Sequence, residues 1–128
     1  MRLLLDTHAM LWFMEEHSSL SRAAYSAIES PDIEVFVSHA SALEIAIKLS
    51  LGKLDLKFPF ERLFPTAVLE NGFEVLALDF AHYHRLLELP HHHRDPFDRL
   101  LIAQAKVEGM NIVTRDPHFA AYGVPILW

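Results

Sequence analysis

The chain has 128 residues, 52% of them hydrophobic, and contains no cysteine. This length predicts a single domain over residues 1–128, with enough apolar side chains for a compact core. No apolar run approaches the ~20 residues of a membrane span, so we expect no membrane association. The absence of cysteine excludes disulfides and thiolate sites, and it agrees with the cytoplasmic location that we expect. The 11 basic and 17 acidic side chains give a net charge of −6, which disfavours coating of nucleic acid by bulk positive charge.

Short apolar runs alternate with longer helical patterns along the chain. In chain order, we expect a strand at Leu3–Leu5, helices over Thr7–Glu15 and from Ser19 or Ser21 to Ile28, a strand at Val35–Val37, helices over Ser41–Ser50 and Phe60–Glu70, a strand at Phe73–Leu78, helices over Asp79–Leu89 and Asp95–Glu108, a strand at Asn111–Thr114, a helical turn over Asp116–Tyr122 and a strand at Pro125–Trp128. We expect Pro65 to break or restart the helix over Phe60–Glu70. This alternation predicts an α/β protein with three α/β/α layers and a mostly parallel sheet of about five strands.

Acidic side chains follow the expected strands at the ends where ligands bind in open parallel sheets. Asp6 ends the first strand, and Glu44 lies in the helix after the second. Asp95 and Asp98 open the long helix, and Asp116 follows the fourth strand. Carboxylates that converge repel one another unless a cation lies between them. Oxygen ligands without cysteine favour a hard cation such as Mg²⁺ or Mn²⁺.

Each of these acids also has a structural interpretation as a helix cap. Asp6, Asp95 and Asp116 stand where N-caps are expected, and Glu44 and Asp98 have the spacing of capping boxes. Capping does not explain why all of these residues lie at the same edge of the sheet. Because an N-cap side chain turns back to the helix amides, we expect Asp98 to be the freer metal ligand, with Asp95 as the second candidate.

Basic and hydroxyl side chains near these acids are candidate supporting residues. Thr114 either bonds a ligand or water or simply ends its strand. The basic candidates for phosphate contacts are Arg94, Arg99, Arg115, Lys48 and Lys53, with ordinary surface charge or pairing with Glu as the alternative for each. Among them we favour Arg99 because it adjoins Asp98.

The run His91–His93 raises the question of a zinc site. Consecutive residues point in different directions on a regular backbone, whereas zinc sites use spaced ligands. We therefore expect a solvated loop before the long helix.

Four segments resemble the motifs of PIN-domain proteins, in particular the VapC-like branch. They are Leu4–His8, Ser38–Lys48, His93–Ala103 and Thr114–Asp116. Leu43 departs from the second motif, which usually has Trp before Glu-Ile. The resemblance spans nearly the whole chain in the right order.

The resemblance implies an endoribonuclease that uses Mg²⁺ or Mn²⁺ and acts as the toxin of a type II toxin–antitoxin pair. It implies a homodimer that is silenced by a cognate antitoxin protein. The catalytic and metal-binding residues that it implies are Asp6, Glu44, Asp98 and Asp116, with Asp95 in the same motif as Asp98.

Two other interpretations stay open at this point. One is a degenerate PIN-like module that binds RNA or protein without catalysis, although its expected mark, the loss of acidic residues, is not seen. The other is a phosphohydrolase with Asp6 as nucleophile. Such enzymes usually carry a second Asp two residues later, where this chain has His8.

Overall fold

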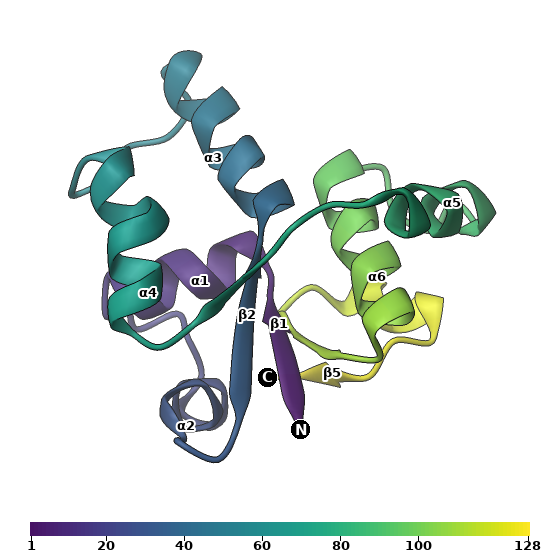
Figure 1. The fold of residues 1–128 in the computed structure, drawn as a ribbon, viewed down its shortest axis with the longest axis horizontal. Coiled ribbons are helices and arrows are strands. Elements are labelled where there is room, and N and C mark those ends of the chain that lie inside the picture. Colours follow the sequence, from purple (N-terminus) through teal and green to yellow (C-terminus); the bar gives the residue numbers. More distant parts are fainter.

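A computed structural model describes all residues from 1 to 128. Five strands form one sheet in the order β3-β2-β1-β4-β5, and every neighbouring pair is parallel. The strands are β1 (Arg2–Leu5), β2 (Glu34–Ser38), β3 (Glu74–Leu76), β4 (Asn111–Val113) and β5 (Ile126–Leu127). The predicted fold class is confirmed, and the carboxyl ends of the central strands meet at one edge (Figure 1).

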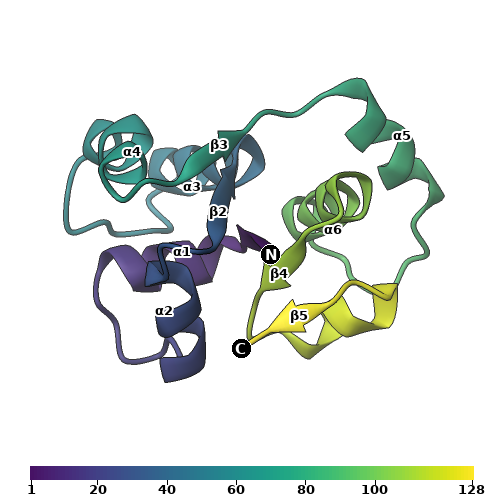
Figure 2. The same ribbon diagram turned by 60° about the horizontal axis from the view of Figure 1, so that its bottom comes forward.

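The helices form the two outer layers. They are α1 (Thr7–Met14), α2 (Arg22–Glu29), α3 (His39–Ser50), η1 (Arg62–Ala67), α4 (Val68–Glu70), α5 (Phe80–Glu88), α6 (Pro96–Glu108) and η2 (Pro117–Tyr122). Figure 2 shows α1 to α4 on one side of the sheet and α5 and α6 on the other. No helix combines the length and the apolar character that crossing a bilayer requires.

Strand β1 lies at the centre of the sheet because it is apolar on both faces. Leu3 and Leu5 are fully buried against the layer of α1 and α2, whereas Leu4 is fully buried against the layer of α6. Successive side chains of a strand point to opposite faces, so a continuous apolar run suits a strand that is covered on both sides. This burial fixes the position of Asp6, the next residue.

Three expected boundaries were wrong. Helix α3 begins at His39 rather than Ser41, since the Ser38 hydroxyl accepts a hydrogen bond from the Ala40 amide and caps the helix. The segment expected to be helical over 60–70, with a break or restart at Pro65, begins at Arg62 as η1 and continues as α4. The break lies inside η1 at Phe64, which precedes this proline and has extended backbone angles. The third strand is shorter than predicted, and the buried Phe73 packs into the core just before it.

Candidate active site

Asp6 is held at the carboxyl end of β1 by two hydrogen bonds. Its Oδ1 accepts from the Ala9 amide at 2.7 Å, which caps α1, and the Thr114 hydroxyl also bonds its carboxylate. Burial raises the pKa of Asp6, although both hydrogen bonds act in the opposite direction. The side chain is therefore a helix cap and a member of the acidic site, and the fully buried Thr114 is placed as a support of Asp6.

Glu44 enters the site from the interior of α3. Because the helix begins at His39, Glu44 lies beyond its first turn and has no capping role. Its Oε1 accepts from the Thr7 hydroxyl at 2.7 Å, and its Oε2 accepts from Lys48 Nζ at 2.6 Å. Thr7 also bonds the Ser41 hydroxyl at 3.0 Å. Lys48 thus neutralises a buried carboxylate, so the alternative of pairing with Glu, and not a phosphate contact, holds for this residue.

Asp95 caps α6 and Asp98 does not, as the sequence predicts. The Asp95 Oδ1 accepts from the amides of Phe97 at 2.8 Å and Asp98 at 3.1 Å, so Asp95 is the N-cap of α6. A capping box would turn the Asp98 side chain back to the Asp95 amide. That amide instead donates to His93 Nδ1 at 3.1 Å. The Asp98 carboxylate is consequently free to face the other acids.

His93 joins two carboxylates of the site. Its Nε2 lies 2.8 Å from Asp116 Oδ2 and 3.2 Å from Asp98 Oδ2. Since His93 Nδ1 accepts from the Asp95 amide, the neutral ring carries its proton on Nε2 and donates to the carboxylates. The expectation of a solvated histidine loop was therefore wrong for His93, whose side chain is only 16% exposed.

Tyr122 holds the loop that carries His93. Its hydroxyl accepts from the His92 amide at 2.9 Å and the His93 amide at 2.8 Å. The guanidinium of Arg99 donates to the same hydroxyl at 3.1 Å. The position of the His93 ring therefore depends on η2 and α6 as well as on its own loop.

Asp98 shows most directly that the carboxylates converge. Burial raises the pKa of Asp98 to about 7, and the negative charges of Asp95, Asp6 and Glu44 act in the same direction, while His93 opposes them. A carboxyl group that stays half protonated near neutral pH lies in a strongly negative environment. Three separate segments of the chain, carrying Asp6, Glu44 and Asp95, create that environment.

Asp116 completes the cluster after β4. Its Oδ1 accepts from the His118 amide at 2.9 Å and caps η2. Burial acts to raise its pKa, but the His118 amide and the ring nitrogens of His93 and His118 donate to the carboxylate, and the net pKa lies below its ordinary value. Asp116 is thus a permanent anion beside Asp98. Asp6 and Asp116 line the same hollow, which has a volume of about 380 Å³.

The donor set fits a hard divalent cation. Carboxylate oxygens of Asp98 and Asp116 and a ring nitrogen of His93 lie within 4.8 Å of one another. The negative charges of Asp6 and Glu44 also act on Asp98, and carboxylate oxygens are the ligands that such a cation prefers. Burial and the neighbouring carboxylates raise the pKa of Asp98, so added positive charge would stabilise its ionised form. An ion among these carboxylates would supply that charge.

A second group of potential ligands has a structural explanation. His82 is fully buried, accepts from the Asp79 amide at 3.1 Å, and has its Nε2 2.9 Å from the Glu108 carboxylate. These bonds cap α5 and tie it to α6. All hydrogen-bonding atoms of the His82 ring are used.

Arg99 is placed differently from our expectation. Its side chain runs inward, and its guanidinium donates to the Pro90 carbonyl at 2.7 Å and to Tyr122. Arg94, Arg115 and Lys53 are exposed and form no ion pair, and Arg115 lies 4.8 Å from the centre of the Trp12 ring. Leu43 is half exposed and does not pack beside Glu44.

Sequence reasoning missed four polar side chains of this site: Thr7, Ser41, His93 and Tyr122. A signal existed for Thr7, which directly follows Asp6, and for Ser41, which lies on the same face of α3 as Glu44. His93 stands two residues before an N-cap, but nothing local shows that its ring reaches β4. Tyr122 bonds residues that are distant in the sequence, so no local pattern indicates its role.

We predict that the ring of His93 is needed for tight metal binding. Replacing His93 by Ala should weaken Mn²⁺ binding by about 10- to 100-fold, the usual effect of removing a group that orients metal ligands. Gln, whose amide reaches toward the position of Nε2, should recover part of the loss, whereas the shorter Asn should not. Titration calorimetry with Mn²⁺ measures this, with the exposed His84→Ala as control. Equal affinities for His93→Ala and the control would refute the role.

The fold and the acidic cluster together are those of a nuclease domain. The family model of the PIN domain matches residues 3–125, so the chain belongs to the PIN domain family, whose members cleave phosphodiester bonds. No curated protein sequence matches the chain.

Solved structures with the same fold include one toxin–antitoxin complex and two proteins bound to DNA. VapBC2 from Rickettsia felis, bound to a DNA fragment from its promoter, has a TM-score of 0.74 and 15% identity, and the match covers 99% of this chain and 98% of that chain. FitAB bound to the IR36 DNA fragment has a TM-score of 0.68 and 18% identity, over 98% and 93% of the two chains. A toxin–antitoxin complex from Klebsiella pneumoniae has a TM-score of 0.64 and 18% identity, over 98% and 96%. At these identities the likeness concerns the fold.

Proposed function

We propose that this chain is an endoribonuclease that depends on Mg²⁺ or Mn²⁺ and serves as the toxin of a toxin–antitoxin pair. The observation that carries the proposal is the group of Asp98, Asp116 and His93, whose ligand atoms lie within 4.8 Å of one another at the edge of the sheet. Burial, together with the charges of Asp95, Asp6 and Glu44, raises the pKa of Asp98 to about 7. The negative charge of these carboxylates repels a phosphodiester in the absence of a cation. Together with a divalent cation, they become a site that attracts one.

Asp6, Asp98 and Asp116 would hold one or two ions, with Asp95 as the further candidate. A bound divalent ion polarises a phosphodiester oxygen and makes attacking water more acidic. Asp6 and Asp116 each keep one oxygen in a helix cap, so both side chains are already oriented before an ion enters. Such preorganisation means that little reordering is needed at the moment of reaction.

Glu44 completes or orients the cluster. The Thr7 hydroxyl and Lys48 fix both of its oxygens, and the residue is only 3% exposed. Its charge adds to the negative potential at Asp98. Lys48 pairs with Glu44 at 2.6 Å in a buried place, so its loss would leave an uncompensated charge.

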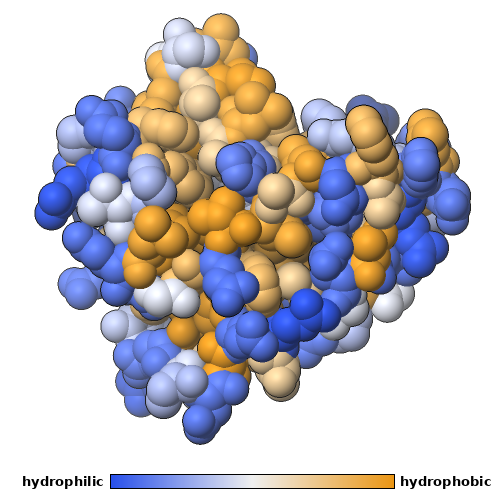
Figure 3. All heavy atoms as spheres, in the orientation of Figure 1, coloured by the Kyte–Doolittle hydropathy of each residue, from blue (hydrophilic) through white to orange (hydrophobic).

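The proposal includes a cognate antitoxin, a homodimer and a cytoplasmic place of action. A structure of the same fold is described as a toxin–antitoxin complex, which supports an antitoxin partner. Two helices also expose apolar stripes of the kind that protein partners cover. They comprise Leu43, Ile47 and Leu51 on α3, and Phe80, Tyr83 and Leu87 on α5. Figure 3 shows apolar surface over α3 at the top of the view.

Cleavage of single-stranded RNA by the purified chain tests the proposed activity. We expect cleavage with Mg²⁺ or Mn²⁺, none with a chelator, and a loss of about a thousandfold in Asp6→Asn, which is the scale for removing charge stabilisation. The control is Asp32→Asn, an exposed Asp before β2. Undiminished activity of Asp6→Asn would refute the assignment of Asp6. A wild-type chain with no activity and no heat on Mn²⁺ addition would instead indicate a binding module.

A further inference from the structure

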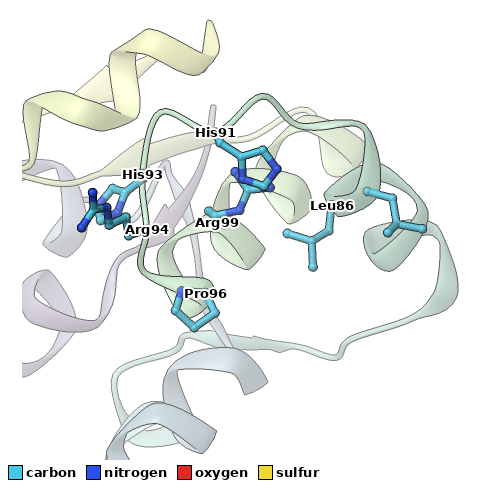
Figure 4. Close-up of a pocket in the computed structure, with 7 residues that line it drawn as sticks. Leu86, His91, His93, Arg94, Pro96 and Arg99 are labelled. Carbon is cyan, nitrogen blue, oxygen red and sulfur yellow. The ribbon is translucent and has the colours of Figure 1, made fainter.

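A second hollow opens beside the carboxylates, on the far side of His93. It has a volume of about 610 Å³ and lies between α5 and the start of α6. Leu86 and Pro96 provide apolar walls, His91, Arg94 and Arg99 provide nitrogen donors, and the ring of His93 forms a further part of the wall (Figure 4). No carboxylate lines it. In a chain with a net charge of −6, this is a local concentration of positive charge.

Arg99 places a buried cation without a counter-ion in the wall of this hollow. The residue is only 9% exposed, and its guanidinium donates to the carbonyls of Leu89 and Pro90 and to the hydroxyl of Tyr122, which are all neutral. The ion pairs formed by lysine and arginine side chains in this protein involve Lys48, Lys57 and Arg85. A buried charge is costly unless it is paired, so the hollow is suited to an anion.

Arg94 adds a second positive charge at the rim. Its side chain is exposed, has no ion pair and lies beside His93 in Figure 4. A guanidinium presents several donors in a fixed plane and binds phosphate through two of them at once. Arg94 is therefore free to contact an anion that enters from solvent.

His93 sets the distance between this hollow and the acidic cluster. The same ring lines the hollow and donates through Nε2 to Asp98 and Asp116. One imidazole thus separates the two sites, so an anion in the hollow and a phosphodiester at the carboxylates are close enough to belong to one strand.

We propose that this hollow binds the phosphate next to the cleaved phosphodiester in a single RNA strand, an inference that rests on the proposed function. Arg94 makes the direct contact, and Arg99 supplies positive potential from the wall. Leu86 and Pro96 pack against the nucleotide that carries this phosphate. The acidic cluster then receives the adjoining bond, so cleavage falls inside a strand rather than at its end.

Replacing one charged phosphate of the RNA by an uncharged group tests the proposed contact at a single position. A short oligoribonucleotide is made in versions that carry one uncharged methylphosphonate at each position in turn, and KM and kcat are measured for wild type, Arg94→Gln and the exposed control Arg22→Gln on α2. With the unmodified RNA, Arg94→Gln should raise KM about tenfold, the scale of a charge-assisted hydrogen bond, and leave kcat nearly unchanged.

The positional pattern decides the outcome. One of the two phosphates that flank the cleaved bond is the proposed partner of Arg94. When the methylphosphonate replaces that phosphate, the contact is lost, so wild type and Arg94→Gln should have the same KM. The slope of log affinity against log salt should fall by about 0.7 in Arg94→Gln. If wild type cleaves the RNA but Arg94→Gln behaves like Arg22→Gln at every position, this inference is overturned while the nuclease proposal stands. An inactive wild type would overturn both.

Discussion

Asp98→Asn should abolish cleavage and at the same time stabilise the metal-free protein. The Asp98 carboxyl is buried among negative charges that raise its pKa to about 7, compared with 3.8 in an unfolded chain. Ionising this group in the folded state therefore costs free energy at pH 8, and Asn removes that cost. We expect a gain of about 1–3 kcal/mol in the free energy of unfolding, allowing for solvent screening at the partly exposed side chain.

The same Asp98→Asn substitution should reduce RNA cleavage. Without the Asp98 oxygen the ion loses a ligand, and activity should fall by about a thousandfold, the scale of a lost charge-stabilising group. Urea unfolding with a chelator and RNA cleavage with Mg²⁺ measure the two effects on the same preparations. Asp55→Asn is the matched control, because Asp55 is exposed and lies away from the cluster. A variant that is both less stable and fully active would contradict the placement of Asp98.

The pH dependence of stability should change sign when a divalent ion is added. In the metal-free protein the raised pKa of Asp98 means that the folded state holds a proton that the unfolded chain has already released. The stabilisation is complete below about pH 4 and is lost as pH rises toward about 7. Asp6, whose pKa is also raised, acts in the same direction. Asp116 has a lowered pKa and changes stability only in more acidic solution.

With Mn²⁺ present, protons compete with the ion for the same oxygens, so binding and the stability that it confers increase with pH. An ion at one hundred times its Kd stabilises the fold by about 2.7 kcal/mol. Urea unfolding at pH 5 and pH 8 should show the metal-free protein more stable at pH 5 and the Mn²⁺ form more stable at pH 8. Both differences should be smaller in Asp98→Asn. If the free energy of unfolding has the same value at each pH with and without Mn²⁺, no ion binds at these carboxylates.

The fold was predictable because its strongest signals are local. Leu3–Leu5 is apolar at every position, which indicates a strand covered on both faces, and the residue after such a strand in a parallel sheet lies at the ligand-binding edge. The capping and ligand interpretations of Asp6 and Asp116 were not exclusive. Each carboxylate has two oxygens, and one caps a helix while the other faces the site.

The supporting residues depend on contacts that no local pattern contains. His93 meets Asp116 across 23 positions of the sequence, and Thr7 meets Glu44 across 37. The inward course of Arg99 is set by Tyr122, which comes from η2, 23 positions further along the chain. Sequence proximity to Asp98 favoured Arg99 as a phosphate contact, but helix geometry turns its side chain away from the acids and toward the loop at Pro90.

The central claim is that Asp6, Asp98 and Asp116 surround a divalent ion. An anomalous-difference map from crystals grown with Mn²⁺ locates such an ion without reference to activity. Our account predicts a strong peak bounded by carboxylate oxygens of these three residues, and no comparable peak at Asp79, His82 and Glu108. An empty acidic cluster in crystals that hold Mn²⁺ elsewhere would contradict it.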